Sequence, residues 1–335
     1  MFKVVHAEAD VNAALPIERA ALAAVGAQLV GAATLASEVF IEAARDADIV
    51  LTENTTITPD ILNGLKQCKA VVMYSIGLDH VDLQTATELG IVIAHTPGFC
   101  VDEVSNHAMM FVLACARRLL SQHERLRAGW WPEARNLEAA LTPMGNLRGE
   151  CLGLLSFGAI ARSLAHKAQA FGLRLVAFDP FVSAEVFAQH GVQSLSLDEV
   201  LAQSDYLSVH TPVTAATKGM LGETQLRKMK PSAFLINTSR GSVVDEAALV
   251  RALREGWIVG AALDVFEQEP PDKSNPLLHM SDVIVTPHSA YCSNASYARV
   301  RQMAADEAVR VLRVEWPLAL ANPAVKGRSR MEGKA

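Results

Sequence analysis

The sequence predicts an α/β protein with two doubly wound parallel sheets, one in each of two domains. Three observations predict this fold class: a length of 335 residues, a composition with 50% hydrophobic and 20% charged residues, and short apolar runs that alternate with helical patterns along the chain. At roughly 150 residues per domain, the length favours two domains. The composition excludes disordered and fibrous proteins, and the alternation is typical of parallel sheets covered by helices on both faces.

The first alternating series occupies about the first hundred residues. Pro16–Val25 predicts a helix that Gly26 ends, and a second helix ends at Gly90. Pro97-Gly98 then interrupts the pattern, and the mostly apolar stretch from Val101 to about Leu120 predicts a long helix. We expect four strands in this series: Lys3–Val5, Ile49–Leu51, Ala70–Met73 and Ile91–Ala94.

The second alternating series begins at Leu152, after a stretch with little periodicity. That stretch, Gly129–Gly149, predicts a loop-rich connection. A final helix is expected from about Ser296 to Val314, and the polar, basic tail after Pro323 is expected to fray. Helical patterns separate six expected strands: Leu152–Leu155, Leu173–Phe178, Tyr206–Val209, Phe234–Asn237, Gly260–Val265 and Val283–Val285.

Charge, hydropathy and cysteine content exclude several classes of function. Thirty Lys and Arg residues against 36 Asp and Glu give a net charge of −6, which disfavours nucleic acid and anionic membranes as partners. The longest apolar run, Ala108–Ala116, is too short to span a bilayer, and the N-terminus does not resemble a signal peptide. The five cysteines are scattered and form no C-x-x-C pair, so we expect a cytoplasmic protein with neither disulfides nor a metal site.

A glycine-containing turn at Ser156–Ala161 lies where a strand is followed by a helix. It has the form S-x-G-x-x-A, close to the dinucleotide-binding fingerprint G-x-G-x-x-G/A. Gly158, Ala159 and Ile160 would begin a helix whose free N–H groups face a pyrophosphate. Ser156 departs from the fingerprint, and a negative φ at this residue would avoid a clash of its Cβ atom.

An acidic residue at the end of the next strand strengthens this prediction. Asp179 is at the spacing expected for a carboxylate that binds the ribose 2′-hydroxyl, and no Arg follows it to bind a 2′-phosphate. The sequence therefore favours NAD over NADP and a Rossmann-like domain. The alternative is a turn without a ligand, in which Asp179 caps a helix.

Three side chains that suit carbonyl reduction follow strands of the second series: Arg240, Glu269 and His288. Because the carboxyl ends of parallel strands meet at one edge, we expect all three to face one site. A His can protonate the alkoxide that hydride transfer forms. A carboxylate hydrogen-bonded to the other nitrogen of the imidazole raises the pKa of the His, and an Arg can bind a substrate carboxylate by two parallel hydrogen bonds. Taken singly, each residue also has a purely structural interpretation.

The most specific stretches of the chain are Asn237–Leu249, Gly260–Pro270 and Thr286-Pro-His288. Through them the sequence resembles the D-isomer-specific 2-hydroxyacid dehydrogenases, which include phosphoglycerate, glycerate and D-lactate dehydrogenases and the C-terminal-binding corepressors. The resemblance extends from about residue 45 to about residue 325. Two departures stand out: Ser156 replaces the first fingerprint Gly, and Asn106 stands where many relatives carry Glu, just before His107.

The resemblance implies a role for each matching residue. Arg240 matches the substrate-binding catalytic Arg, and Glu269 and His288 match the acid/base pair. The implied substrate-binding residues are Ser75, Ile76, Gly77, Arg240 and His288. The implied cofactor-binding residues are Cys100, Ser156, Gly158, Ala159, Ile160, Asp179, His210, Thr211, Pro212, Thr238, Ser239 and Asp264, the last of them beside the nicotinamide carboxamide.

The resemblance also implies a domain plan. Residues 1–100 and 291–335 would form a flavodoxin-like substrate-binding (catalytic) domain, and residues 101–290 an NAD-binding Rossmann domain. The active site would lie in a cleft between them. Family members are commonly dimers through the NAD domain, and the apolar stretch from Val101 to Leu120 fits either a dimer interface or an internal core.

The function expected first is NAD-dependent reduction of a 2-keto acid to a D-2-hydroxy acid, or the reverse oxidation, by a homodimer. Its partners would be a small 2-keto or 2-hydroxy acid and neither nucleic acid nor membrane. Formate dehydrogenases carry Gln at the position of Glu269, so this residue argues against that activity. Phosphite dehydrogenases carry Lys at the position of Ile76, which argues against that activity as well. The alternative is an NADH-sensing adaptor like the corepressors, because these proteins keep the same three residues.

Overall fold

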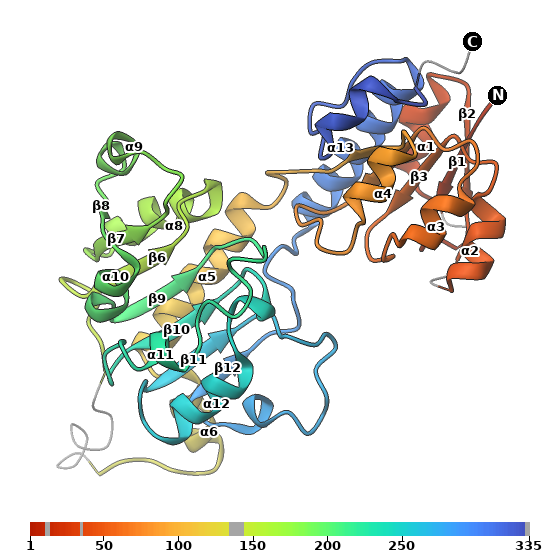
Figure 1. Ribbon diagram of the computed structural model, residues 1–335. Helices are drawn as coiled ribbons and strands as arrows, with labels where there is room; N and C mark the ends of the chain where they lie inside the picture. The colour runs from red at the N-terminus through yellow and green to blue at the C-terminus, as the bar shows by residue number, and fades with distance from the viewer. Residues whose placement is uncertain (11–13, 34–35, 134–143, 332–335) are drawn as a thin grey trace. The chain divides into compact units, whose positions relative to one another are not determined.

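Two parallel β-sheets organise the chain, one in each of two compact units (Figure 1). The structure is a computed structural model that describes residues 1–10, 14–33, 36–133 and 144–331. Unit 1 comprises Met1–Phe99 and Ser293–Ala335, and unit 2 comprises Cys100–Cys292. The chain thus leaves unit 1 and returns to it, at positions within two residues of the boundaries given above.

Unit 1 contains a five-stranded sheet with the order β2-β1-β3-β4-β5. Its strands are parallel, and the order reverses between β1 and β3, so this sheet is doubly wound. β3 and β4 are fully buried apolar runs, as expected for strands covered on both faces. The strands are β1 (Phe2–His6), β2 (Ala27–Gly31), β3 (Ile49–Thr52), β4 (Ala70–Met73) and β5 (Val92–Ala94).

Helices cover this sheet and pack around a core that includes Phe40, Leu62 and Ile93. The side chains of Thr58 and Asp82 accept backbone N–H bonds and thereby cap two of these helices. α1 and α13 lie against each other, so the two ends of the chain meet in one unit (Figure 1). The helices are α1 (Pro16–Ala23), α2 (Ser37–Ala44), α3 (Pro59–Gly64), α4 (Leu83–Glu88) and α13 (Asn294–Leu312).

The tail after Pro323 is folded, at least as far as residue 331, so the expectation that it frays is wrong. A 3-10 helix, η4 (Pro323–Gly327), buries Val325 completely, and Met331 is also buried. Arg330 donates from Nη1 to the carbonyl oxygen of Leu65 at 2.7 Å. A basic composition predicts an exposed tail, but two apolar side chains and an arginine that binds carbonyl groups hold this one against unit 1.

Unit 2 contains a seven-stranded parallel sheet with the order β12-β11-β10-β9-β6-β7-β8. The order reverses between β6 and β9, which makes this sheet doubly wound as well and gives it the Rossmann arrangement. Apolar cores lie on both faces, because alternate residues of one strand, such as Leu154 and Leu155, belong to different cores. The strands are β6 (Cys151–Leu155), β7 (Arg174–Phe178), β8 (Gln193–Ser194), β9 (Tyr206–Val209), β10 (Phe234–Asn237), β11 (Gly260–Leu263) and β12 (Val283–Val285).

The long helix expected from Val101 to about Leu120 is two helices. α5 ends at Ala116, and Arg118 adopts a left-handed φ of 50° before α6 begins at Leu119. The apolar pattern continues across the break, so it did not reveal a change in backbone direction. The helices of unit 2 are α5 (Val101–Ala116), α6 (Leu119–Arg127), α8 (Ala159–Ala170), α9 (Ala184–Gln189), α10 (Leu197–Gln203), α11 (Glu223–Leu226) and α12 (Glu246–Arg254), with 3-10 helices η2 (Gly241–Val243) and η3 (Pro276–His279).

The described part of the chain has neither a disulfide nor a metal-binding cluster nor a membrane-spanning helix. None of the five cysteines, all of which are described, is in a disulfide; four are buried and Cys292 is exposed. Within the described ranges, no group of three His, Cys, Asp or Glu side chains has an arrangement that could hold a metal ion. The same ranges contain no helix that is both long and apolar enough to cross a bilayer. The predicted connection at 129–149 lies partly outside the described residues.

Candidate active site

The glycine-containing turn joins β6 to α8 at the point where the strand order of unit 2 reverses. In open α/β sheets, ligands bind in the crevice at such a reversal. Ser156 has a φ of 69°, so the negative φ considered above is not found. An L-residue in this left-handed region is strained, and glycine is the residue that avoids the strain. Ser156 is therefore a conformational departure from the fingerprint as well as a chemical one.

The N-terminus of α8 leaves room for a ligand. Gly158 is the N-cap residue, and no atom lies within 4 Å of the position that a Cβ atom would occupy there. Ala159 and Ile160 begin the helix, whose free N–H groups and dipole favour an anion. Among the described residues, the buried hydroxyl of Thr238 has no hydrogen-bond partner, so a ligand could supply one. These features fit a bound dinucleotide.

Asp179 follows β7 and holds the turn together. Its Oδ2 accepts the Phe157 N–H at 2.9 Å, and its Oδ1 accepts the Phe181 N–H at 2.9 Å. The N-cap of α9 is Ser183, so the interpretation of Asp179 as a helix cap is wrong. Its carboxylate lies at the end of β7, immediately beside the Gly158 turn.

The segment His210-Thr211-Pro212 follows β9, the strand across the reversal from β6. The His210 N–H donates to the carbonyl oxygen of Leu155, which ties this segment to the end of β6. Burial lowers the pKa of His210 to about 4, so its ring is neutral at physiological pH. The hydroxyl of Ser239 donates to the carbonyl oxygen of Thr211, so the loops after β9 and β10 lie side by side.

Arg240 stands at the end of the β10 loop, where the backbone is packed tightly. A Cβ atom on the next residue, Gly241, would lie 1.9 Å from the carbonyl carbon of Phe266, so only glycine fits there. This close approach brings the β10 loop against the loop that carries Glu269. The Arg240 Nη1 donates to the carbonyl oxygen of Ser239 at 2.9 Å.

Glu269 and His288 form a direct pair. The Nδ1 atom of His288 lies 2.6 Å from Oε2 of Glu269, and Oε1 of Glu269 accepts the Phe266 N–H at 2.9 Å. Burial alone would raise the pKa of Glu269, but the bonds from His288 and Phe266 and the charges of His288 and Arg240 together lower it. Glu269 is therefore an anion at neutral pH that is aimed at one nitrogen of the imidazole.

The pair opens into a cavity of unit 2 with a volume of about 390 Å³. Asp264, Glu269 and His288 supply its ionisable groups. The rest of the lining is largely apolar, which strengthens electrostatic interactions made there. The apolar and proline residues that line it are Phe266, Pro270, Pro271, Leu278, Val285 and Pro287.

In unit 1, the loop Ser75-Ile76-Gly77 follows β4. All three of its carbonyl oxygens accept hydrogen bonds: Ser75 O from Thr96 N–H, Ile76 O from His95 and Gly77 O from its neighbour Ser75 Oγ at 2.8 Å. Among the described residues, no acceptor is found for the N–H groups of Ile76 and Gly77. The loop therefore presents two adjacent amide donors at the carboxyl end of the sheet.

Residues 109–290 match the family described as D-isomer specific 2-hydroxyacid dehydrogenase, NAD binding domain. The chain belongs to this family. The resemblance given by the sequence motifs is thereby confirmed, as is the expectation of an NAD-dependent dehydrogenase. Unit 2 contains the matched NAD-binding domain.

Known relatives of the dehydrogenase agree with this assignment. A glyoxylate reductase of Korarchaeum cryptofilum is 36% identical over 290 residues, which cover 86% of each chain. A glycerate dehydrogenase of Methylorubrum extorquens is 35% identical over 278 residues, or 82% of this chain and 85% of the relative. The structure of D-lactate dehydrogenase from Aquifex aeolicus, complexed with NAD and lactic acid, is similar with a TM-score of 0.85 at 26% identity, covering 95% and 99% of the two chains.

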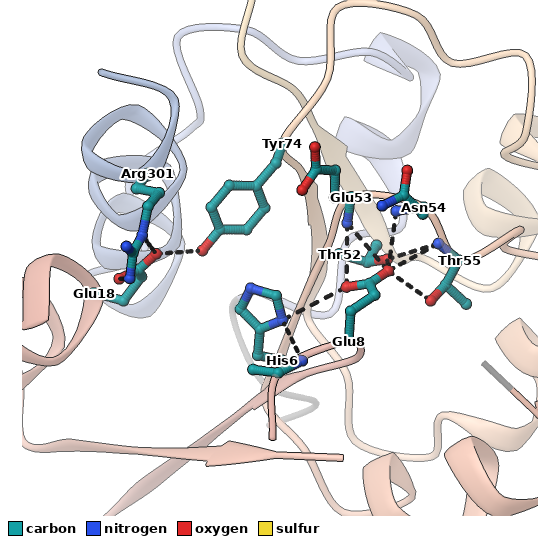
Figure 2. Close-up of polar contacts among 10 residues, drawn as sticks. His6, Glu8, Glu18, Thr52, Glu53, Asn54, Thr55, Tyr74 and Arg301 are labelled. Atoms are coloured by element: carbon teal, nitrogen blue, oxygen red, sulfur yellow. Dashed lines mark hydrogen bonds and ion pairs between the residues drawn. The ribbon is translucent and has the colours of Figure 1, made fainter. Parts of the chain in front are cut away.

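The sequence analysis did not predict a polar cluster in unit 1, which lies at the carboxyl ends of strands β1 and β3 (Figure 2). The last residue of β3 and the loop after it surround Oε1 of Glu8. The hydroxyls of Thr52 and Thr55 donate to it at 2.6 and 2.7 Å, and the N–H groups of Asn54 and Thr55 at 3.0 and 2.9 Å. Burial raises the pKa of Glu8, but these bonds outweigh it and leave the pKa lowered. An acidic residue that follows β1 and a Thr-rich turn after β3 were the available signals.

A second part of this cluster lies directly before the loop Ser75-Ile76-Gly77. Tyr74, directly before Ser75, donates its hydroxyl to Oε1 of Glu18 at 3.2 Å (Figure 2). Glu18 is fully buried and accepts two bonds from Arg301 of α13, at 2.7 and 2.8 Å. Cys100, expected near the nicotinamide, is buried at the N-cap position of α5.

Proposed function

We propose that this dehydrogenase reduces a 2-keto acid to the D-2-hydroxy acid, or oxidises the hydroxy acid, with His288 as the general acid and base. NADH, when bound, supplies the hydride. The observation that carries the proposal is the 2.6 Å contact between His288 Nδ1 and Glu269 Oε2. Because Glu269 binds Nδ1, the other ring nitrogen is left to give its proton to the carbonyl oxygen of the substrate.

Arg240 is proposed to bind the substrate carboxylate. Its guanidinium is planar and can hold a carboxylate by two parallel bonds, which also fixes the direction of the adjacent carbonyl. The fixed backbone at Gly241 supports this role, because it holds Arg240 beside the Glu269 loop. In unit 1, the N–H groups of Ile76 and Gly77 are proposed as further donors to a substrate carboxylate.

Asp179 is proposed to bind the ribose hydroxyls of the adenosine half of NAD. Its carboxylate lies next to the Gly158 turn, and its negative charge would repel the 2′-phosphate of NADP. The residues proposed to contact the rest of the cofactor are Cys100, Ser156, Gly158, Ala159, Ile160, His210, Thr211, Pro212, Thr238, Ser239 and Asp264.

The dehydrogenase is also proposed to be a homodimer through unit 2. Three large apolar side chains of α5 and α6 are exposed: Met110 by 45%, Leu119 by 60% and Leu126 by 52%. Apolar residues spread along two consecutive helices are a common feature of interfaces between identical chains. Sedimentation of the purified protein at several concentrations would test this proposal.

A substrate panel tests the proposed reaction. Purified protein is assayed for NADH oxidation with glyoxylate, pyruvate, hydroxypyruvate and larger 2-keto acids, and the chirality of the product is determined. Turnover of at least one acid to the D-product is expected. Tight NADH binding without turnover of any acid would contradict the proposal and favour the NADH-sensing adaptor.

A further inference from the structure

His107 on α5 contacts the polar network behind the proposed general acid. Its Nε2 lies 3.0 Å from the hydroxyl oxygen of Thr286 and 3.8 Å from Oδ1 of Asp264. Asp264 exposes 1% of its side chain and His107 15%, so both are largely shielded from water. The ring of His107 also packs edge-on against Phe111, with centroids 4.6 Å apart, which fixes its orientation.

The direction of each hydrogen bond follows from the number of protons available. The Thr286 hydroxyl has one proton and donates it to Oδ1 of Asp264. Its oxygen must then accept from His107, so Nε2 of His107 carries a proton. Burial lowers the pKa of His107 more than the Asp264 charge raises it, which favours a neutral ring. The chain of bonds therefore runs from His107 N–H through the Thr286 hydroxyl to Asp264.

Asp264 in turn holds the loop that carries His288. Its Oδ1 accepts the Ser289 N–H and its Oδ2 the Ala290 N–H, both at 2.9 Å. Its backbone oxygen accepts the N–H of His288 at 2.8 Å. His288 has a left-handed φ of 50°, a conformation that persists only where the surroundings impose it. The loop that carries His288 is thus bound to Asp264 through both the carboxylate and the backbone oxygen.

We propose that His107 and Thr286 are positioning residues that act through Asp264 to hold the His288 imidazole in its reactive orientation. This inference rests on the proposed function, because it assigns His288 as the proton donor. The side chains of His107 and Thr286 bond to each other and to Asp264, so their action on His288 is indirect. Loss of either bond would remove a contact that helps to fix the Asp264 carboxylate and the loop bound to it, and a general acid misplaced by a fraction of an ångström loses efficiency.

Matched pairs of variants test the proposal. His107→Phe keeps the ring and loses the donor, whereas His107→Gln keeps a donor N–H. Thr286→Val keeps the shape and loses the hydroxyl, whereas Thr286→Ser keeps the hydroxyl. For the best keto acid, we expect kcat to fall about 10–100-fold in His107→Phe and Thr286→Val and to stay within about threefold in His107→Gln and Thr286→Ser. His166→Phe, an exposed residue of α8, is the control and should match the wild type.

A second readout does not depend on turnover. The protein is labelled with ¹⁵N-histidine, and the NMR signals of the His288 ring are assigned by their loss in His288→Ala. Their chemical shifts should change in His107→Phe and Thr286→Val and stay unchanged in His107→Gln and Thr286→Ser. Equal loss of kcat in both members of a pair, or unchanged kcat and unchanged signals in all four variants, would overturn the inference. If the wild type reduced no keto acid, the proposed function would fail, and the ring signals alone would still decide whether His107 and Thr286 position His288.

Discussion

His288 Nδ1 and Glu269 Oε2 lie 2.6 Å apart although 19 positions separate the two residues in the chain. β11 and β12 are neighbouring parallel strands, so the loops that follow them leave the sheet at the same edge. Glu269 is fixed by the Phe266 N–H, and the His288 backbone by the carbonyl oxygen of Asp264. Both partners are therefore placed by backbone bonds, and such preorganisation is what the proposed proton-transfer pair requires.

Removal of the imidazole tests the assigned proton donor. His288→Ala should lower kcat for keto-acid reduction by about 10²–10⁴-fold, the contribution usual for a general acid, because no other group replaces the proton. NADH affinity, measured by fluorescence titration, should stay within about twofold. His123→Ala removes an exposed histidine of α6 and is the control. A kcat equal to that of the wild type would exclude His288 from the mechanism.

Glu269→Gln tests the charge that supports the imidazole. The pKa of Glu269 is lowered, so its carboxylate stays ionised throughout the neutral range and accepts the hydrogen bond from His288 Nδ1. An amide in its place can donate to Nδ1 instead, and would then hold the ring in the wrong tautomer. The kcat for keto-acid reduction should therefore fall by about 10²–10⁴-fold. A kcat equal to that of the wild type, measured with NADH and keto acid saturating, would show that the carboxylate does not act on the ring.

The sequence was sufficient to predict the central strands of both sheets, because buried parallel strands are continuous apolar runs. The expected bounds of β10 (Phe234–Asn237) are those observed, and the expected strand Ile49–Leu51 is one residue shorter than β3 (Ile49–Thr52). β8 (Gln193–Ser194) was not expected, because it is a two-residue exposed edge strand that carries no pattern. β2 and α2 were missed as well, although β2 pairs along the whole of β1.

The three candidate catalytic residues could be predicted from the sequence, whereas the contacts of His107 and of Glu8 could not. Arg240, Glu269 and His288 follow strands, and strand ends of one sheet converge whatever the side chains do. The contact of His107 with Thr286 spans 179 positions, and that of Glu8 with Thr55 spans 47. Such contacts depend on which helix covers which strand and on side-chain rotamers, and no local pattern in the sequence encodes these.

Ser156→Gly tests the backbone strain in the glycine-containing turn at Ser156–Ala161. Ser156 has a φ of 69°, which costs an L-residue about 1–2 kcal/mol, while glycine loses about 0.5–1 kcal/mol in chain entropy on folding. The free energy of unfolding in urea should rise by about 0.5 kcal/mol, and NADH should bind at least as tightly as in the wild type. Gly158→Ala, at φ −77°, is the contrasting variant: its added methyl enters the open space before α8 and should weaken NADH binding without loss of stability.

Glu8→Gln tests the carboxylate held by the loop after β3. The folded-state pKa of Glu8 is lowered, so its stabilising contribution is present above the unfolded pKa, near 4.5, and is lost as the pH falls through the lower folded value. At pH 7 the variant should lose about 1.5–3 kcal/mol, typical of hydrogen bonds to a charged group. The difference from the wild type should shrink below about pH 4.5. Glu42→Gln, whose side chain is 80% exposed, should show no such difference at either pH.

Arg301→Met tests the buried ion pair beside the Ser75-Ile76-Gly77 loop, which is proposed to bind the substrate. Glu18 is fully buried and accepts two bonds from Arg301, so removal of the cation leaves an uncompensated carboxylate that should cost about 3–5 kcal/mol of unfolding free energy. The double variant Arg301→Met with Glu18→Leu removes both charges and should recover most of that loss, because the desolvated carboxylate is gone.

Arg313→Met, at an exposed position just after α13, is the control for loss of a positive charge. Tyr74 bonds to Glu18 and directly precedes Ser75. The Arg301→Met variant should therefore also raise KM for the keto acid more than it lowers kcat. Chemical denaturation and steady-state kinetics measure the two effects. Additive losses in the double variant would show that the two side chains contribute independently and that the pair is not the source of the stability.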